Sequence, residues 1–161
     1  MKGHSLAASS RIVAQAVEKA GVRVAAALRL PAHSRVLILK RVRLADGEPL
    51  TVQMAHLPAS LVPGLEIGER SSLYEVLQNR YHLYAARAKE TYVAATAGAS
   101  AAKLLGIRVG APVFKVERIS FLPNDKPFEY VQSIICGDRY SIVLDLVKHG
   151  AEKRTLELTG G

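Results

Sequence analysis

Two arginines two positions apart are the residues of this sequence best suited to chemistry. Arg41 and Arg43 lie in the segment RVLILKRVRL, whose composition predicts a β-strand. Side chains two apart on a strand leave the same face, so the two guanidinium groups would lie close together. They would repel each other unless an anion or a carboxylate lay between them, and arginine binds phosphate or carboxylate in bidentate geometry. The pair indicates an anion site; an exposed or carboxylate-paired arginine pair is the alternative.

A second polar group stands at the start of an expected helix. Ser72 and Glu75 have the S-x-x-E spacing of a capping box. The first turn of a helix has N–H groups without partners and a partial positive charge, which attract anions. The Ser72 hydroxyl could therefore cap the helix or donate to a ligand, and Tyr74 could face the ligand or the core.

Glu129 and Gln53 are polar residues on expected strands that should largely face the core. A buried polar group without a partner costs about 1–3 kcal/mol, so each needs a partner or a ligand. A salt bridge from Glu129 to an arginine is the alternative to ligand binding.

Other chemistries lack their motifs. The five histidines have no metal-binding spacing, there is no CxxC, and neither phosphate-binding glycine motif occurs. The single cysteine, Cys136, lies in an apolar run and is expected to be a small buried hydrophobe. No nucleophile stands beside a base. We therefore expect no catalytic residue, no metal and no cofactor.

The composition predicts one domain that neither spans a membrane nor binds DNA directly. The chain has 161 residues, 49% of them apolar, and a net charge of +8. Its basic residues are scattered and not interleaved with aromatic residues, unlike a nucleic-acid surface. No apolar run reaches the roughly 20 residues of a membrane span, and no secretory signal begins the chain. A single cysteine fits the reducing cytoplasm.

The sequence also contains an internal repeat. Residues 28–43 align without a gap to residues 105–120, and Arg41 falls on Arg118. With one inserted residue the match continues into the turn of each copy. Two copies of one supersecondary unit predict a closed, pseudo-symmetric α+β domain.

Each copy predicts a strand, a helix and a β-hairpin. Residues 11–20 carry a helical apolar stripe, but the repeat places them opposite a strand-like segment, so we predict a strand there. Asp46-Gly47 and residues 124–126 supply the hairpin turns. The expected strands are 11–20, 35–44, 49–57, 88–95, 111–122 and 127–136, and the expected helices 22–30, 71–81 and 97–106.

Four segments together resemble one family. RVRLADGEPLTVQMAHLP, SSLYEVL, SAAKLLGIRVGAPVFKVERISF and PFEYVQSIICGDRYSIVLDL are similar to the effector-binding (UTRA) domain of GntR-type transcription regulators of the HutC subfamily, over residues 10–147. The resemblance implies a chorismate-lyase-like antiparallel sheet with helices. It also implies a homodimer that senses a small molecule and controls DNA binding allosterically. Residues 1–9 would then be a junction after a winged-helix domain that binds operator DNA, and residues 148–161 a C-terminal tail.

The resemblance also assigns roles to the polar residues described above. Arg41 and Arg43 stand where the family grips an effector phosphate, and Ser72 and Tyr74 match residues that line the effector pocket. Glu129 matches an acidic residue that contacts polar effectors, and Gln53 stands where the family often has Glu. We therefore expect an anionic effector, phosphate or carboxylate, at these six positions.

Three departures from the family pattern modify this expectation. Gln53 replaces Glu, His56 replaces a tyrosine, and Ile134-Ile135-Cys136 replaces a tyrosine-rich strand. We expect a retained anion site in a more apolar and less acidic pocket, and thus an effector whose anionic head is attached to something other than an ordinary hexose, such as a smaller or more apolar phosphate ester or carboxylate. Two other functions stay open: an effector-only protein that forms mixed dimers with a full regulator, and a chorismate-lyase-like enzyme with Glu129 as its acid or base.

Overall fold

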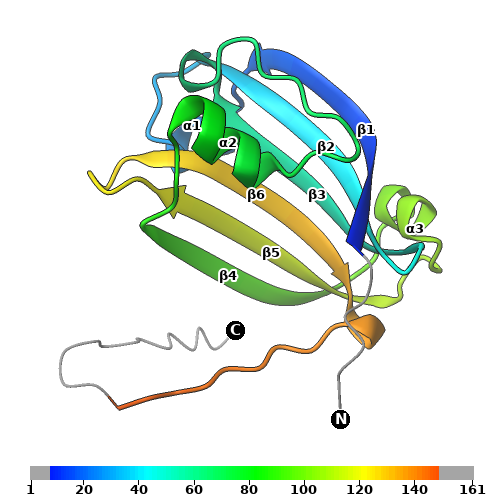
Figure 1. Ribbon diagram of the computed structural model, residues 1–161. Coiled ribbons are helices and arrows are strands. Elements are labelled where there is room, and N and C mark those ends of the chain that lie inside the picture. Colours follow the sequence, from blue (N-terminus) through cyan, green and yellow to red (C-terminus); the bar gives the residue numbers. More distant parts are fainter. Residues whose placement is uncertain (1–7, 149–161) are drawn as a thin grey trace.

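The computed structural model describes residues 8–148 as six antiparallel strands in one sheet, accompanied by three α-helices (Figure 1). The strand order across the sheet is β1-β2-β3-β6-β5-β4. The strands are β1 (Ala8–Lys19), β2 (Arg35–Ala45), β3 (Glu48–Pro58), β4 (Arg87–Thr96), β5 (Pro112–Phe121) and β6 (Pro127–Cys136). The helices are α1 (Val22–Ala27), α2 (Leu73–Tyr81) and α3 (Ala99–Leu105), with short 3-10 turns η1 (Ala59–Leu61) and η2 (Gly137–Arg139). The predicted α+β class is confirmed.

The internal repeat sets the topology. The first copy forms β1, α1, β2 and β3, the second forms β4, α3, β5 and β6, and the two meet where β3 pairs with β6. Met54 pairs with Gln132, and Gln132 is also the residue of the second copy that corresponds to Met54 in the repeat. The register is therefore symmetric about this pair, as expected for two copies related by a pseudo-twofold axis.

The strand predicted in place of a helix at residues 11–20 is confirmed. β1 pairs with β2 along its length, with one irregularity between Ile12 and Ala14. Pairing with a neighbouring strand thus outweighs the local helical pattern. The predicted helix at 22–30 was too long: α1 ends at Ala27, and Arg29 adopts a left-handed conformation with φ of 51°. Pro31 follows, and a helix normally ends before a proline.

Turns and caps follow the predicted chemistry. Asp46 and Gly47 both have positive φ, 50° and 77°, as a two-residue hairpin of type I′ requires. Gly106 ends α3 in the left-handed conformation. Ser72 is the N-cap of α2, and its Oγ accepts a hydrogen bond from the backbone N–H of Glu75 at 3.4 Å.

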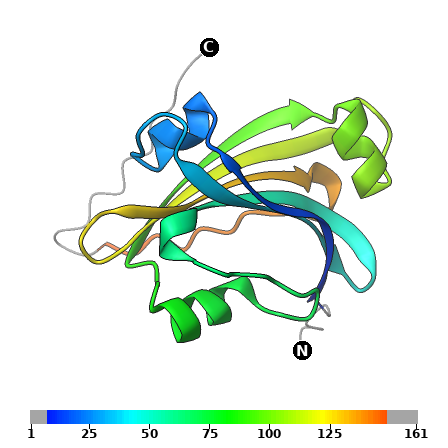
Figure 2. The same cartoon turned by 90° about the horizontal axis from the view of Figure 1, so that it is seen from above.

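Helices cover both faces of the sheet (Figure 2). On one face, α2 and the loop before it cover a core that includes Leu39, Leu57 and Leu77. On the opposite face there are two smaller apolar clusters. One contains Leu28 at the end of α1, and the other contains Leu105 of α3. Each face therefore has its own apolar core.

The expected junction at residues 1–9 and tail at residues 148–161 lie almost entirely outside the described residues. Ala8 and Ser9 already belong to β1.

Candidate functional site

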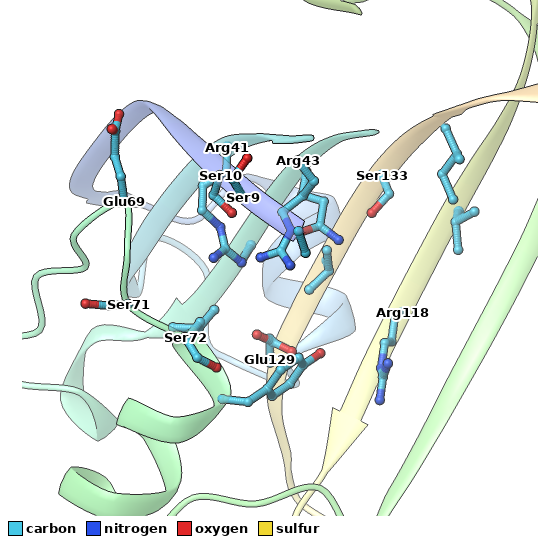
Figure 3. Close-up of a pocket in the computed structure, with 18 of the residues that line it drawn as sticks. Ser9, Ser10, Arg41, Arg43, Glu69, Ser71, Ser72, Arg118, Glu129 and Ser133 are labelled. Carbon is cyan, nitrogen blue, oxygen red and sulfur yellow. The ribbon is translucent and has the colours of Figure 1, made fainter. Parts of the chain in front are cut away.

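A cavity of about 590 Å³ lies on the face of the sheet that α2 covers, and all six predicted site residues line it. Figure 3 shows Arg41 and Arg43 extending from β2 toward Glu129 of β6 and Ser72 at the start of α2. The other two predicted residues are Gln53 of β3 and Tyr74 of α2. Residues far apart in the sequence thus meet because β2, β3 and β6 are adjacent in the sheet.

Arg41 is a buried cation with unused donors. Its side chain is only 6% exposed, and its Nε and Nη1 have no hydrogen-bond partner among residues 8–148. Burial lowers the pKa of Arg41 and the neighbouring Arg43 acts in the same direction, whereas Glu129 opposes the shift. Arginine stays protonated in proteins nonetheless. An unpaired buried donor costs about 1–3 kcal/mol, and this guanidinium can therefore gain a favourable partner from an acceptor, above all an anion.

Glu129 is buried even more completely. It is 1% exposed, its Oε1 lacks a hydrogen-bond partner, and no salt bridge reaches it within the described part of the chain. Burial raises the pKa of Glu129 to about 7, although Arg118 and Arg41 act in the opposite direction. Near neutral pH the carboxyl group is therefore divided between its two forms and could donate or accept a hydrogen bond. The alternative of a plain salt bridge is not what the structure shows.

The start of α2 supplies two further groups to the cavity. Ser72 Oγ accepts from the Glu75 N–H, so the hydroxyl hydrogen is left to donate. Tyr74 is half exposed and does not belong to the core, and the Arg118 guanidinium carbon lies 5.9 Å from its ring centroid. Capping and ligand contact are therefore compatible at this helix start.

Arg118 is a cavity residue that our list of site residues missed. It comes from β5 and approaches the cavity from the side opposite Arg41 (Figure 3). Its Nη1 lies 3.4 Å from Oε1 of Glu90, and its Nε is buried without a partner among the described residues. The signal was present in the sequence, because Arg118 is the repeat counterpart of Arg41. A duplicated hairpin places equivalent positions on the same face of the sheet.

The rest of the wall is rich in hydroxyl groups. Its carboxylates are engaged: Glu69 accepts from the Ile12 N–H at 3.3 Å, and Glu90 accepts from the Tyr92 hydroxyl at 2.7 Å. The hydroxyl groups come from Ser9, Ser10, Ser71, Ser133, Tyr92 and Tyr140.

The departures from the family pattern divide between the two faces. Gln53 and Ile135 line the cavity. His56 is buried on the opposite face, with Nδ1 3.1 Å from a β6 carbonyl oxygen, and Ile134 and Cys136 pack near α3. The expectation of a more apolar pocket was wrong for these three positions, because strand alternation turns them away from the cavity. The expectation of a more apolar and less acidic pocket therefore rests on Gln53 and Ile135 alone.

Within residues 8–148 no three metal-binding side chains come together. None of the described helices is both long enough and apolar enough to cross a membrane.

Comparisons with known proteins agree with this architecture. The family model described as the UTRA domain matches residues 4–141. The transcriptional repressor NagR of Bacillus subtilis (strain 168) is 31% identical over 144 residues, which cover 89% of this chain and 59% of that protein. The chain spans about half the length of the curated relatives it matches.

Two solved structures match closely in three dimensions. The effector domain of PhnF from Mycobacterium smegmatis has a TM-score of 0.85 and 29% identity, covering 91% of both chains. A GntR-family transcriptional regulator from Enterococcus faecalis V583 has a TM-score of 0.79 and 29% identity, covering 86% of this chain and all of that one. The six-stranded antiparallel sheet with its helices thus matches the fold of GntR-family effector domains.

Proposed function

The chain belongs to the UTRA domain family, and we propose that it is the effector-sensing and dimerising domain of a bacterial GntR-type regulator of the HutC subfamily. In this proposal residues 10–147 form the sensing domain of a homodimer in the cytoplasm. A winged-helix domain that precedes it binds operator DNA. Binding of an anionic small molecule in the cavity then shifts the relative placement of the two DNA-binding domains.

The observation that carries the proposal is the unpaired Arg41 guanidinium inside the cavity. Its Nε and Nη1 have no hydrogen-bond partner among the described residues, so both can donate to an anion, and Arg43 stands beside it on the same strand. The hydroxyl of Ser72 faces the same space. Glu129 would contact a hydroxyl or amine in the rest of the effector, because it can both donate and accept near neutral pH.

Only a modest coupling is needed for regulation. A coupling free energy of about 1–3 kcal/mol between effector and DNA changes the affinity roughly 5–150-fold. Ordering of α2 around a bound anion would supply such a difference, since Ser72 and Tyr74 lie in its first turn and line the cavity.

A thermal-shift screen tests the proposal. The protein is screened against sugar phosphates, phosphonates, imidazole carboxylates and fatty acids, beside the double variant Arg41→Ala/Arg43→Ala. A ligand at 100 times its Kd should stabilise the protein by about 2.7 kcal/mol, a shift of several degrees in Tm. The double variant should lose this shift.

The matched control removes two arginines that do not line the cavity. Arg35 and Arg108 are exposed, so Arg35→Ala/Arg108→Ala changes the net charge equally and should keep the full shift. If no anion stabilises the protein, or if a stabilising anion ignores Arg41 and Arg43, the proposal fails.

The raised pKa of Glu129 favours one second candidate, an enzyme of the chorismate-lyase type with Glu129 as general acid or base. Incubation with chorismate, followed by analysis of the products, distinguishes this enzyme from the effector sensor. Product formation that Glu129→Gln abolishes would establish the enzyme, whereas saturable binding without turnover supports the sensor.

A further inference from the structure

The cavity has cationic side chains on two opposite sides. Arg41 and Arg43 extend from β2, whereas Arg118 extends from β5, beyond Glu129 and Ser133 of β6 (Figure 3). β3 and β6 lie between β2 and β5, so three strand spacings of about 4.8 Å separate the two backbones, about 14 Å in total. The repeat accounts for this arrangement, because Arg118 is the counterpart of Arg41 in the second copy. Each copy of the repeat therefore supplies arginine to its own side of the cavity.

Arg118 keeps a donor that its neighbours do not use. Its Nη1 lies 3.4 Å from Oε1 of Glu90, which stands opposite it in the β4–β5 ladder. Both side chains are 36% exposed, and an ion pair so open to water contributes little stability. Glu90 also accepts a hydrogen bond from the Tyr92 hydroxyl at 2.7 Å. The Arg118 Nε is buried without a partner in the described part of the chain, so it can donate to an acceptor in the cavity.

The charges of the cavity lining do not balance. Four arginines and three carboxyl groups line the cavity, and Glu129 is one of the three. Burial raises the pKa of Glu129 to about 7, so this group is only partly ionised at neutral pH. The other two carboxyl groups, those of Glu69 and Glu90, already accept hydrogen bonds from the chain. The lining thus has a positive surplus that a single carboxylate would not fully compensate, which favours a ligand with more than one negative charge.

We propose that the effector carries a second acidic group, a carboxylate, which Arg118 holds while Arg41 and Arg43 hold the first. The body of the effector then lies across β3 and β6, where Gln53 and Ser133 line the space between the arginines. A guanidinium group matches the planar geometry of a carboxylate, and a hydrogen bond between the two charged groups is strong. The inference rests on the proposed effector-binding function, and it narrows the effector to a molecule that is acidic at both ends.

A competing role for Arg118 is to neutralise Glu129 without touching a ligand. The charge of Arg118 does oppose the rise in the pKa of Glu129, but no salt bridge joins the two side chains among residues 8–148. The two roles predict different behaviour. An arginine that contacts the ligand discriminates between molecules with and without the second acidic group, whereas an arginine that only neutralises Glu129 affects the binding of both molecules alike.

Calorimetric titration with paired probes tests the second contact. The probes are α,ω-dicarboxylic acids and ω-phosphonocarboxylic acids with linkers of increasing length, each beside the analogue in which one carboxylate is replaced by a carboxamide. At the best linker length the wild-type chain should bind the diacid at least about tenfold more tightly than its amide, as expected for one hydrogen bond between charged groups. Arg118→Gln should remove this preference and leave the Kd of the amide largely unchanged. Arg41→Ala/Arg43→Ala should lose the binding of both probes.

Arg70→Gln is the matched control, because Arg70 is exposed, lines the same cavity and carries the same charge as Arg118. This variant should keep the preference for the diacid, which would exclude a general effect of charge in the cavity. Equal binding of diacid and amide at every linker length, or a preference that survives in Arg118→Gln, would overturn the second contact and leave the anion sensor intact. Absence of binding by every probe, or binding that ignores Arg41 and Arg43, would instead refute the proposed function, and this inference with it.

Discussion

At the scale of residues, the cavity holds a buried cation and a buried acid with no salt bridge between them among the described residues. Arg41 and Glu129 both keep atoms without hydrogen-bond partners, and burial raises the pKa of Glu129 to about 7 while it lowers that of Arg41. Each group therefore destabilises the empty protein, as is usual where binding determines the choice of residue. The residue types are readable from the sequence, but the pKa of Glu129 is not, because it depends on desolvation by the surrounding strands.

The raised pKa of Glu129 predicts a loss of stability with rising pH. The folded protein holds this proton up to about pH 7, whereas the unfolded chain releases it near the ordinary value of 4.5. Folding thus takes up a proton between these values, and the free energy of unfolding falls as the pH rises from about 4.5 to 7. Glu129→Gln, which stays neutral, should be more stable than wild type at pH 8 but not at pH 5. The gain should be a few kcal/mol, since one pKa unit corresponds to about 1.4 kcal/mol.

Urea unfolding at pH 5 and pH 8 measures this effect in a chloride medium without phosphate or carboxylate ligands. His56 acts in the opposite sense, because burial lowers its pKa, but it is present in both proteins and cancels in their difference. An equal difference at both pH values would show that Glu129 is ionised throughout and that its burial is relieved by a partner.

At the scale of elements, Ser72 has two roles at the start of α2, one in the stability of the helix and one in the lining of the cavity. The side chain caps the helix, accepting from the Glu75 N–H, and it also lines the cavity. Ser72→Ala should cost about 0.5–1 kcal/mol, the lower part of the range for lost N-caps, and weaken anion binding. Ser72→Asp should retain the helix, because aspartate caps equally well and favours the helix dipole. Its charge should nevertheless weaken anion binding at least tenfold.

Urea unfolding and titration with a ligand from the thermal-shift screen separate the two roles. Glu75→Gln, which changes a charge in the same turn outside the cavity lining, serves as the control and should bind normally. Anion binding by Ser72→Asp at wild-type strength would remove Ser72 from the site.

The sequence predicted the strands and their faces better than it predicted the loop before α2. The repeat allowed β1 to be chosen over a helix, and the alternation of β2 placed Arg41 and Arg43 on one face. The loop between η1 and α2 has no counterpart in the repeat, so nothing in the pattern predicted that Glu69 would reach β1. Arg118 was missed because we searched for pairs close in sequence, whereas the sheet joins positions across the two copies.

At the scale of the whole molecule, the site lies between two halves that the duplication made similar. The first half supplies Arg41 and Ser72, the second supplies Arg118 and Glu129, and the β3–β6 ladder holds them in register. Neither half has a complete cavity wall. Duplication thus gave the cavity an arginine from each copy, whereas α2, which lies between the two copies and has no counterpart, made the site asymmetric.

This division predicts that the two halves fold only together. A cut between Tyr84 and Ala85 falls in the connection between α2 and β4, where Tyr84 is exposed, and gives fragments 1–84 and 85–161. Each fragment alone leaves β3 or β6 as an uncovered edge with half its core exposed, so neither should unfold cooperatively. Mixing them should restore the circular dichroism of the intact chain and the anion-dependent rise in Tm. A Met54→Pro fragment, which places proline at the centre of the β3–β6 ladder, should prevent recovery. Cooperative folding and anion binding by fragment 1–84 alone would show instead that the first half is the complete sensor and that Arg118 and Glu129 are dispensable.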